Sequence, residues 1–211
     1  QPQASSSRAG KPAGLLHVSI KPSSLSSRFD PLSFEDSVSR ALTRARPIAE
    51  LAVKLGASLT RDMEQYERRD LTLELAKRLL EDPAVGSTLR LGVVMQTYLR
   101  DAELVAQELL EWLGRHRRRL AIRLVKGAYW DYEVAVSRQR NWPAPVWLEK
   151  TQTDRTFDQL TELFLQHHEV VDAEIGSHNV RSIAHAMAVA EALRLPPERV
   201  ESVKRRPRAR S

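Results

Sequence analysis

The feature that most constrains this chain is a regular alternation between short apolar runs and longer stretches with helical periodicity. The apolar or β-branched runs are at 15–20, 57–62, 91–96, 120–126 and 172–178. The helical patterns are at 33–55, 71–80, 102–112, from after 133 to about 140, 154–166 and 180–193. The lengths of the two kinds of segment separate strands from helices. Repeated strand–helix units predict an α/β fold with a parallel sheet, either doubly wound or closed into a barrel.

Polar residues at the ends of the predicted strands favour the barrel. Both folds bind ligands at the carboxyl ends of their strands. Five successive strands end in groups that can form hydrogen bonds, which suits a ring facing one pocket better than a crevice between two strands. In chain order these groups are Lys21, Asp62 with Glu64, Gln96, Arg123 with Lys126, and the triplet Ser177, His178 and Asn179.

The chain length limits how much of a barrel can form. The 211 residues are enough for one domain, but a complete α/β barrel typically needs about 250. Residues 1–14 are rich in Gly, Pro, Ser and Ala without periodicity, so we expect a disordered lead and order from near Leu15. The first residue is Gln rather than Met, so we expect a processed protein or a piece of a longer one.

The charge distribution does not predict a nucleic-acid partner. The chain has 33 Lys+Arg against 27 Asp+Glu, a formal net charge of +6. The basic residues concentrate at 115–119 and 204–211, and no aromatic residues are interleaved with them. The middle of the chain mixes both signs, as a solvated helical surface does. We therefore expect no nucleic-acid binding.

Several other classes of protein are excluded or disfavoured by the sequence. The absence of cysteine excludes disulfides, thiolate metal sites and cysteine nucleophiles, and it fits a cytoplasmic protein. No apolar run approaches the roughly 20 residues of a membrane-spanning helix, and residues 1–14 lack the apolar core of a signal peptide. No glycine-rich dinucleotide or P-loop motif follows any strand. The histidines show no spacing with carboxylates that indicates a metal site.

The strand ends lie within five longer segments: IKPSSL (20–25), RDMEQY (61–66), VVMQTYLRDAE (93–103), RLVKGAYWDYE (123–133) and GSHNVRSIAHA (176–186). Taken together and in this order, these segments resemble the proline dehydrogenase domain of the bifunctional proline utilisation A flavoenzymes. The resemblance runs from about Val18 to about Pro197, and the segment RLVKGAYWD is its most specific part.

The resemblance implies a (β/α)8 TIM-like barrel that is incomplete here, with about five strands and the start of a sixth over residues 15–200. It implies FAD held without a covalent bond at the carboxyl ends of the strands. L-proline would be oxidised there to Δ1-pyrroline-5-carboxylate by hydride transfer from C5 to the flavin N5, and a membrane quinone would accept the electrons. It also implies a cytoplasmic protein, peripheral at the inner membrane, with a covalently linked aldehyde dehydrogenase domain in the full-length protein.

Three residues match catalytic or substrate-contacting positions of that family. Asp62 would face the secondary amine of proline, and Lys21 would face its carboxylate; without the resemblance, these two would be read as an ion pair. Arg123 would donate a hydrogen bond near the flavin N5 and stabilise the charge gained on reduction, because a guanidinium stays protonated. The structural alternative for Arg123 is an arginine paired on the barrel rim.

The remaining matched positions would contact FAD. Gln96 can donate to and accept from the pyrimidine edge of the flavin. Gly127 and Ala128 would let the backbone approach the cofactor closely. Trp130 would stack on the adenine or be an ordinary aromatic at a helix start. Lys126 would reach a phosphate or stay exposed, and these two readings are open. The other implied contacts are Val125, Lys150, Ser177, His178 and Asn179.

The last residues depart from the family pattern. Residues 201–211 are basic and lack apolar periodicity, whereas the family continues into further strands and a paired arginine motif that clamps the proline carboxylate. We therefore expect a chain without that arginine pair and without measurable proline turnover. The alternative is a non-catalytic fragment that binds an acidic partner through its basic tail.

Overall fold

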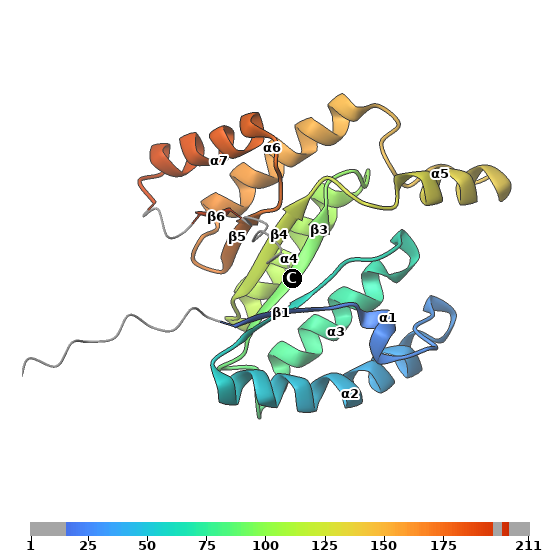
Figure 1. The fold of residues 1–211 in the computed structure, drawn as a ribbon, viewed down its shortest axis with the longest axis vertical. Helices are drawn as coiled ribbons and strands as arrows, with labels where there is room; N and C mark the ends of the chain where they lie inside the picture. The colour runs from blue at the N-terminus through green and yellow to red at the C-terminus, as the bar shows by residue number, and fades with distance from the viewer. Residues whose placement is uncertain (1–15, 196–199, 203–211) are drawn as a thin grey trace, which may run out of the picture.

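The computed structural model of the protein describes residues 16–195 and 200–202. Within these residues the sheet has six parallel strands, which follow one another in chain order across the sheet (Figure 1). The strands are β1 (His17–Ile20), β2 (Ser58–Arg61), β3 (Arg90–Gln96), β4 (Leu120–Val125), β5 (Val171–Ile175) and β6 (Val200–Ser202).

Helices connect the strands and cover one face of the sheet. Parallel crossovers are right-handed, so a strictly sequential strand order keeps every connecting helix on the same face. Contacts of α2 with β2, α3 with β3, and α6 with both β4 and β5 agree with this. The helices are α1 (Pro22–Leu25), α2 (Phe34–Leu55), α3 (Arg69–Glu81), α4 (Ala102–His116), α5 (Trp130–Gln139), α6 (Lys150–Gln166) and α7 (Val180–Ala192), with short 3-10 turns η1 (Pro31–Ser33) and η2 (Tyr66–Arg68).

This topology confirms the prediction of an α/β fold of the barrel type, with five strands and the start of a sixth. The doubly wound alternative is wrong, because that fold requires a reversal of strand order and helices on both faces.

The two faces of the sheet differ in polarity. In β4, the residues of the helix-covered face, Leu120, Ile122 and Leu124, are fully buried. The alternate residues Ala121, Arg123 and Val125 face the concave interior and are partly exposed. The core therefore lies between the sheet and the helices, and the concave side is left for polar groups.

The sheet curves strongly enough to bring distant strands together. The guanidinium of Arg123 on β4 reaches the side chains of His17 and Ser19 on β1. Three strand spacings separate these strands, about 14 Å in a flat sheet. A contact across that separation requires the sheet to wrap around its concave face, as a barrel wall does.

Some element bounds differ from the sequence predictions. Helix α6 begins at Lys150 rather than 154, and β5 ends at Ile175, so residues 176–179 form a loop. The first two residues of the predicted basic tail, 201 and 202, belong to β6. The predicted lead 1–14 and the rest of that tail, 203–211, lie outside the described residues.

Candidate active site at the carboxyl ends of the strands

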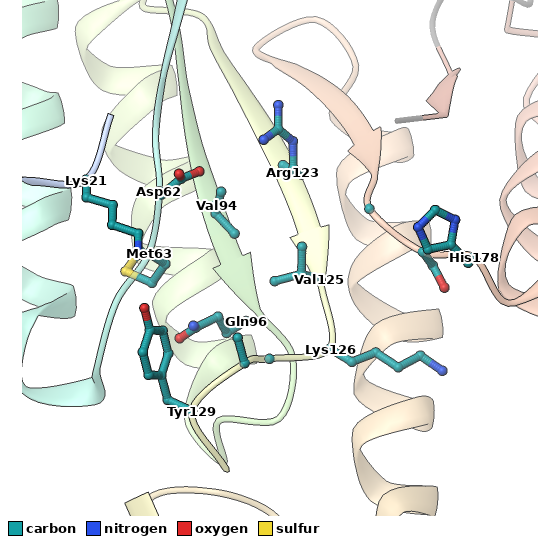
Figure 2. A pocket seen from close by; sticks show the side chains of 14 residues that line it. Lys21, Asp62, Met63, Val94, Gln96, Arg123, Val125, Lys126, Tyr129 and His178 are labelled. Atoms are coloured by element: carbon teal, nitrogen blue, oxygen red, sulfur yellow. The ribbon is translucent and has the colours of Figure 1, made fainter. Parts of the chain in front are cut away.

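A cavity of about 570 Å³ opens at the carboxyl ends of the strands. Lys21, Asp62 and Met63 lie on one side of it and His178 on the other (Figure 2). Ten of the predicted site residues line this cavity, which brings together groups up to 157 positions apart in the chain (178 minus 21). They are Lys21, Asp62, Gln96, Arg123, Val125, Lys126, Gly127, Ala128, Ser177 and His178.

Lys21 and Asp62 face the cavity with their charges uncompensated. Lys21 follows β1 and Asp62 follows β2, and the Asp62 backbone N–H donates to the Ile20 carbonyl over 3.0 Å. Neither side chain forms an ion pair with any described residue, so the simple ion pair that residue chemistry alone suggested is absent from this part of the chain. One cation and one anion thus point into the same space.

A buried carboxylate holds these two strand ends together. Glu64 accepts hydrogen bonds from the Ser23 backbone N–H (2.9 Å) and the Ser23 hydroxyl (2.6 Å), and it is 4 % exposed. Bonds to a charged acceptor are stronger than bonds between neutral groups. Glu64 therefore positions Lys21 relative to Asp62.

Gln96 ends β3 with an unsatisfied acceptor. Its side chain is 2 % exposed, and its Oε1 has no hydrogen-bond partner among the described residues. A buried acceptor without a partner costs roughly 1 to 3 kcal/mol. The side chain lines the cavity, so an N–H donor on a bound molecule would remove that cost.

The turn after β4 depends on Gly127. Its φ of 136° is in a region that only glycine adopts readily, and an added Cβ would lie 2.4 Å from the Tyr98 ring. The close approach that explains this glycine is therefore to Tyr98 of the same chain. The turn also places Ala128 and Tyr129 at the cavity.

Lys126 and Lys150 share one carboxylate. Both ammonium groups bond to Asp154, Lys126 to Oδ1 and Lys150 to Oδ2. Burial works against ionisation of the Asp154 carboxyl, but the bonds from Lys126 and Lys150 hold its pKa below the ordinary value. Two cations on one anion leave a local positive charge at the start of α6, which favours an anionic group there.

Arg123 lines the cavity, but its guanidinium points back toward the amino ends of the strands (Figure 2). It forms an ion pair with Glu174 on β5, with Nε 2.9 Å from Oε2. Both side chains are largely buried, at 15 % and 10 % exposed. The alternative of a paired arginine therefore describes its contacts, although the pair lies inside the barrel wall rather than on its rim.

The loop after β5 supplies the other side of the site. Ser177 and His178 line the cavity, whereas Asn179 caps α7 by accepting from the Arg181 N–H at 2.9 Å. Gly176 is required here, since an added Cβ would lie 2.6 Å from the Leu124 carbonyl oxygen. The loop thus runs against the end of β4.

Three predicted cofactor contacts do not line this cavity: Trp130, Lys150 and Asn179. Trp130 begins α5, is 39 % exposed and donates from its indole N–H to the Trp147 carbonyl over 2.8 Å. Lys150 and Asn179 lie at the starts of α6 and α7. Their proposed contacts would have to be made by a ligand that extends beyond the cavity.

Sequence reasoning missed Met63, Val94, Tyr129 and Gly176, which also line the cavity. Tyr129 lies inside the most specific motif, between Ala128 and Trp130, and that position could have indicated it. Met63 and Val94 carry no chemical signal in the sequence.

Within residues 16–195 and 200–202, no helix is long and apolar enough to cross a bilayer, and no three side chains of the metal-ligating types cluster.

Comparison with known proteins agrees with the fold. The model of the family described as proline dehydrogenase matches residues 2–204. The chain is 29 % identical over 168 residues to the bifunctional protein PutA of Salmonella typhimurium and 29 % identical over 168 residues to that of Rhizobium meliloti. These alignments cover 79 % of this chain but only 13 % and 14 % of the relatives.

Solved structures give the same result. Proline utilization A from Bdellovibrio bacteriovorus, inactivated by N-propargylglycine, superposes with a TM-score of 0.84 at 34 % identity, over 87 % of this chain and 19 % of that one. A mutant of Bradyrhizobium japonicum proline utilization A gives 0.82 at 26 % identity, over 88 % and 19 %. The chain thus spans less than a fifth of these relatives. Since the family match covers nearly its whole length, the chain belongs to the proline dehydrogenase family.

Proposed function

We propose that the cavity at the carboxyl ends of β1 to β5 is the proline-oxidising site of this family, with FAD as its cofactor. The observation that carries the proposal is the pair Lys21 and Asp62, two opposite charges without ion-pair partners among the described residues, facing one cavity. The same cavity contains the unsatisfied Oε1 of Gln96.

The two charges suit an amino acid in its zwitterionic form. Lys21 would bind the carboxylate of L-proline, and Asp62 would bind the secondary ammonium. Charge-assisted hydrogen bonds of this kind are each worth roughly 1.5 to 3 kcal/mol. The bonds from Ser23 to Glu64 keep the two strand ends in place, so less ordering is needed when the substrate binds. L-proline would leave as Δ1-pyrroline-5-carboxylate.

The described residues also fit a flavin dinucleotide. The buried acceptor of Gln96 matches an N–H on the pyrimidine edge of a flavin, and the positive charge shared by Lys126 and Lys150 matches a pyrophosphate. FAD supplies the acceptor for the hydride of the substrate. Val125, Gly127 and Ala128 would form the cavity wall against it, and Arg123 would provide positive charge near the reacting edge.

Contacts along the cavity edge, at Ser177 and His178, and beyond it, at Trp130, Lys150 and Asn179, are proposed for the rest of the dinucleotide. Trp130 would stack on the adenine, and Ser177, His178 and Asn179 would bind the ribityl chain and phosphates near the start of α7. Lys150, at the start of α6, would bind the same phosphates. Each of these residues lies on a loop or a helix start beside the strand ends.

We further propose a membrane quinone as the final electron acceptor and peripheral attachment of an otherwise cytoplasmic protein. The curated relatives are named bifunctional, and we propose a covalently linked aldehyde dehydrogenase domain as the second activity of the full-length protein. The second candidate is a non-catalytic chain that binds an acidic partner through its basic tail, 201–211. Most of that tail, 203–211, lies outside the described residues.

Ligand binding to two charge variants tests the proposal. In the FAD-loaded chain, L-proline should perturb the visible flavin spectrum in a saturable way. Lys21→Met and Asp62→Asn should each weaken that binding by roughly tenfold or more, because each removes a charge-assisted bond. Lys77→Met is the matched control, because Lys77 lies on α3 over the Trp112 ring and does not line the cavity. Equal proline affinity in all four proteins would contradict the proposal.

A further inference from the structure

The side chain of Arg123 is held in the interior of the barrel, away from the cavity mouth. Its Cα is in register with Val94 and Glu174, and through the register of β1, β2 and β3 it lies level with Lys21. Its guanidinium nevertheless reaches His17, which precedes Lys21 by four residues. Four residues of strand span about 13 Å. The guanidinium thus extends toward the amino ends of the strands (Figure 2), whereas Gln96 and Lys126 mark the carboxyl ends.

Two partners hold it there from opposite sides. Glu174, on the neighbouring strand β5, accepts from Nε at 2.9 Å. His17, on β1, lies 2.8 Å from a terminal guanidinium nitrogen through its Nε2, and the Ser19 hydroxyl lies 3.5 Å from the other terminal nitrogen. Glu174 and His17 are hereafter called the arginine clamp.

The chemistry of this contact fixes the tautomer of His17. A guanidinium can only donate, so His17 Nε2 must be the unprotonated nitrogen. The proton is then on Nδ1, which lies 2.8 Å from the Ser58 hydroxyl oxygen. That hydroxyl can in turn donate to the Leu16 carbonyl over 3.5 Å. The Thr60 hydroxyl, 3.1 Å from the same Nε2, can also donate to it. The ring is therefore set to accept from Arg123 and Thr60 and to donate to Ser58.

The clamp has two consequences for the proposed cofactor site. Glu174 places a negative charge against the guanidinium and reduces the positive field that Arg123 can exert at the mouth. The bond to His17 exists only while the side chain points away from the mouth, so the guanidinium must break it in order to reach a group bound there.

We infer that His17 and Glu174 are positioning residues that restrain Arg123 and thereby lower the reduction potential of a flavin bound at the mouth. The effect on the reduction potential rests on the proposed function, whereas the restraint of Arg123 does not. Reduction adds negative charge to the flavin, so any change that frees or uncompensates the guanidinium should favour the reduced form.

The first experiment needs no cofactor. Two-bond proton–nitrogen NMR spectra of the ligand-free chain should show His17 with its proton on Nδ1 and a hydrogen-bonded Nε2. The Nε2 signal should move in Arg123→Met and stay in Asp172→Asn, which removes a charge from the same face of β5. A proton on Nε2, or identical His17 signals with and without the Arg123 guanidinium, would overturn the clamp.

The second experiment measures the midpoint potential of FAD bound to the chain. Glu174→Gln and His17→Leu should each raise the reduced-to-oxidised ratio at fixed potential about tenfold, a positive shift of about 30 mV for a two-electron couple. His17→Gln keeps an acceptor for the guanidinium and should stay near the wild-type value. Asp172→Asn should also leave the potential unchanged.

The outcomes distinguish failure of the role of the clamp from failure of the proposed function. No shift, a negative shift, or an equal shift in Asp172→Asn would overturn the role of the clamp in setting the potential. Failure of every variant, and of the wild type, to retain FAD would count against the proposed function, while the NMR result would still decide whether the clamp exists.

Discussion

At the scale of single residues, the positions that matter are those whose polar groups lack partners. Lys21, Asp62 and the Oε1 of Gln96 face a cavity, where a ligand can satisfy them. Arg61 is different. It is fully buried on the helix-covered face of β2, and none of its three guanidinium nitrogens has a hydrogen-bond partner among the described residues. Burial lowers the pKa of Arg61 to about 10.

Replacing Arg61 should stabilise the protein. Arg61→Met keeps an unbranched side chain of similar length and removes an unpaired buried charge, so we expect the free energy of unfolding to rise by about 1 kcal/mol or more. Urea denaturation followed by circular dichroism measures this. Arg40→Met is the control, since Arg40 forms an exposed pair with Asp36 and should change stability by less than about 0.5 kcal/mol. A destabilised Arg61→Met protein would show that Arg61 has a partner.

The pH dependence of stability provides an independent check on Arg61. Its pKa is about 10 in the folded protein, below the ordinary value of an arginine, so the unfolded chain binds more protons at and above pH 10. Stability should therefore rise with pH across that window, by the contribution of this one group. The difference between wild type and Arg61→Met should shrink as the pH increases from 10 toward 12. A difference that stays constant would contradict the assigned ionisation.

At the scale of secondary-structure elements, the turn after β4 is the most constrained connection. The positive φ of Gly127 and the Tyr98 ring beside it both exclude a Cβ. A Cβ added to Gly114 in α4 would instead have no neighbouring atom within 4 Å. The strand ends and this turn together place the cavity wall.

Two glycine substitutions should have opposite effects. Gly127→Ala should destabilise the protein by about 1 to 3 kcal/mol or more, through backbone strain and collision with Tyr98. Gly114→Ala should stabilise it by about 0.5 to 1 kcal/mol, because alanine is the better helix former and meets no neighbour. Thermal denaturation of both variants checks this. A Gly127→Ala protein as stable as the wild type would show that the turn can relax.

The sequence predicted the elements better than the contacts between them. Strand and helix periods are local, and polar residues at strand ends are visible in the chain. The clamp could not be predicted, because His17 and Arg123 are 106 positions apart and meet only through the curvature of the sheet. The start of α6 was missed since its N-cap, Glu149, forms no side-chain cap hydrogen bond. The burial of Arg61 gave no signal, as a charged residue in a strand reads as exposed.

At the scale of the whole molecule, the curved sheet gathers charged groups from several strands around one cavity. Among the lysines and arginines that line the cavity, Arg123 is paired with Glu174 and Lys126 with Asp154, and within the described residues Lys21 forms no ion pair. A proline carboxylate would therefore meet a single available cation. Bidentate binding by arginine is the stronger arrangement for a carboxylate.

The chain on its own should accordingly show no measurable proline turnover. Compared with a site in which a pair of arginines also binds the proline carboxylate, this site lacks two charge-assisted bonds, at roughly 1.5 to 3 kcal/mol each. Their absence would weaken proline binding by about a hundredfold to ten-thousandfold. A dye-reduction assay with excess FAD and L-proline measures this. Robust turnover would show that Lys21 and Asp62 suffice for substrate binding.

FAD binding to the chain tests the central claim most directly. A titration followed by quenching of flavin fluorescence should show saturable binding of one FAD per chain. Gln96→Leu should weaken it by roughly three- to tenfold, because the buried acceptor is removed. Trp142→Ala, a change at an exposed side chain that does not line the cavity, should leave it unchanged. Absence of binding, or equal affinity in the wild type and Gln96→Leu, would contradict the assignment of this cavity as the flavin site.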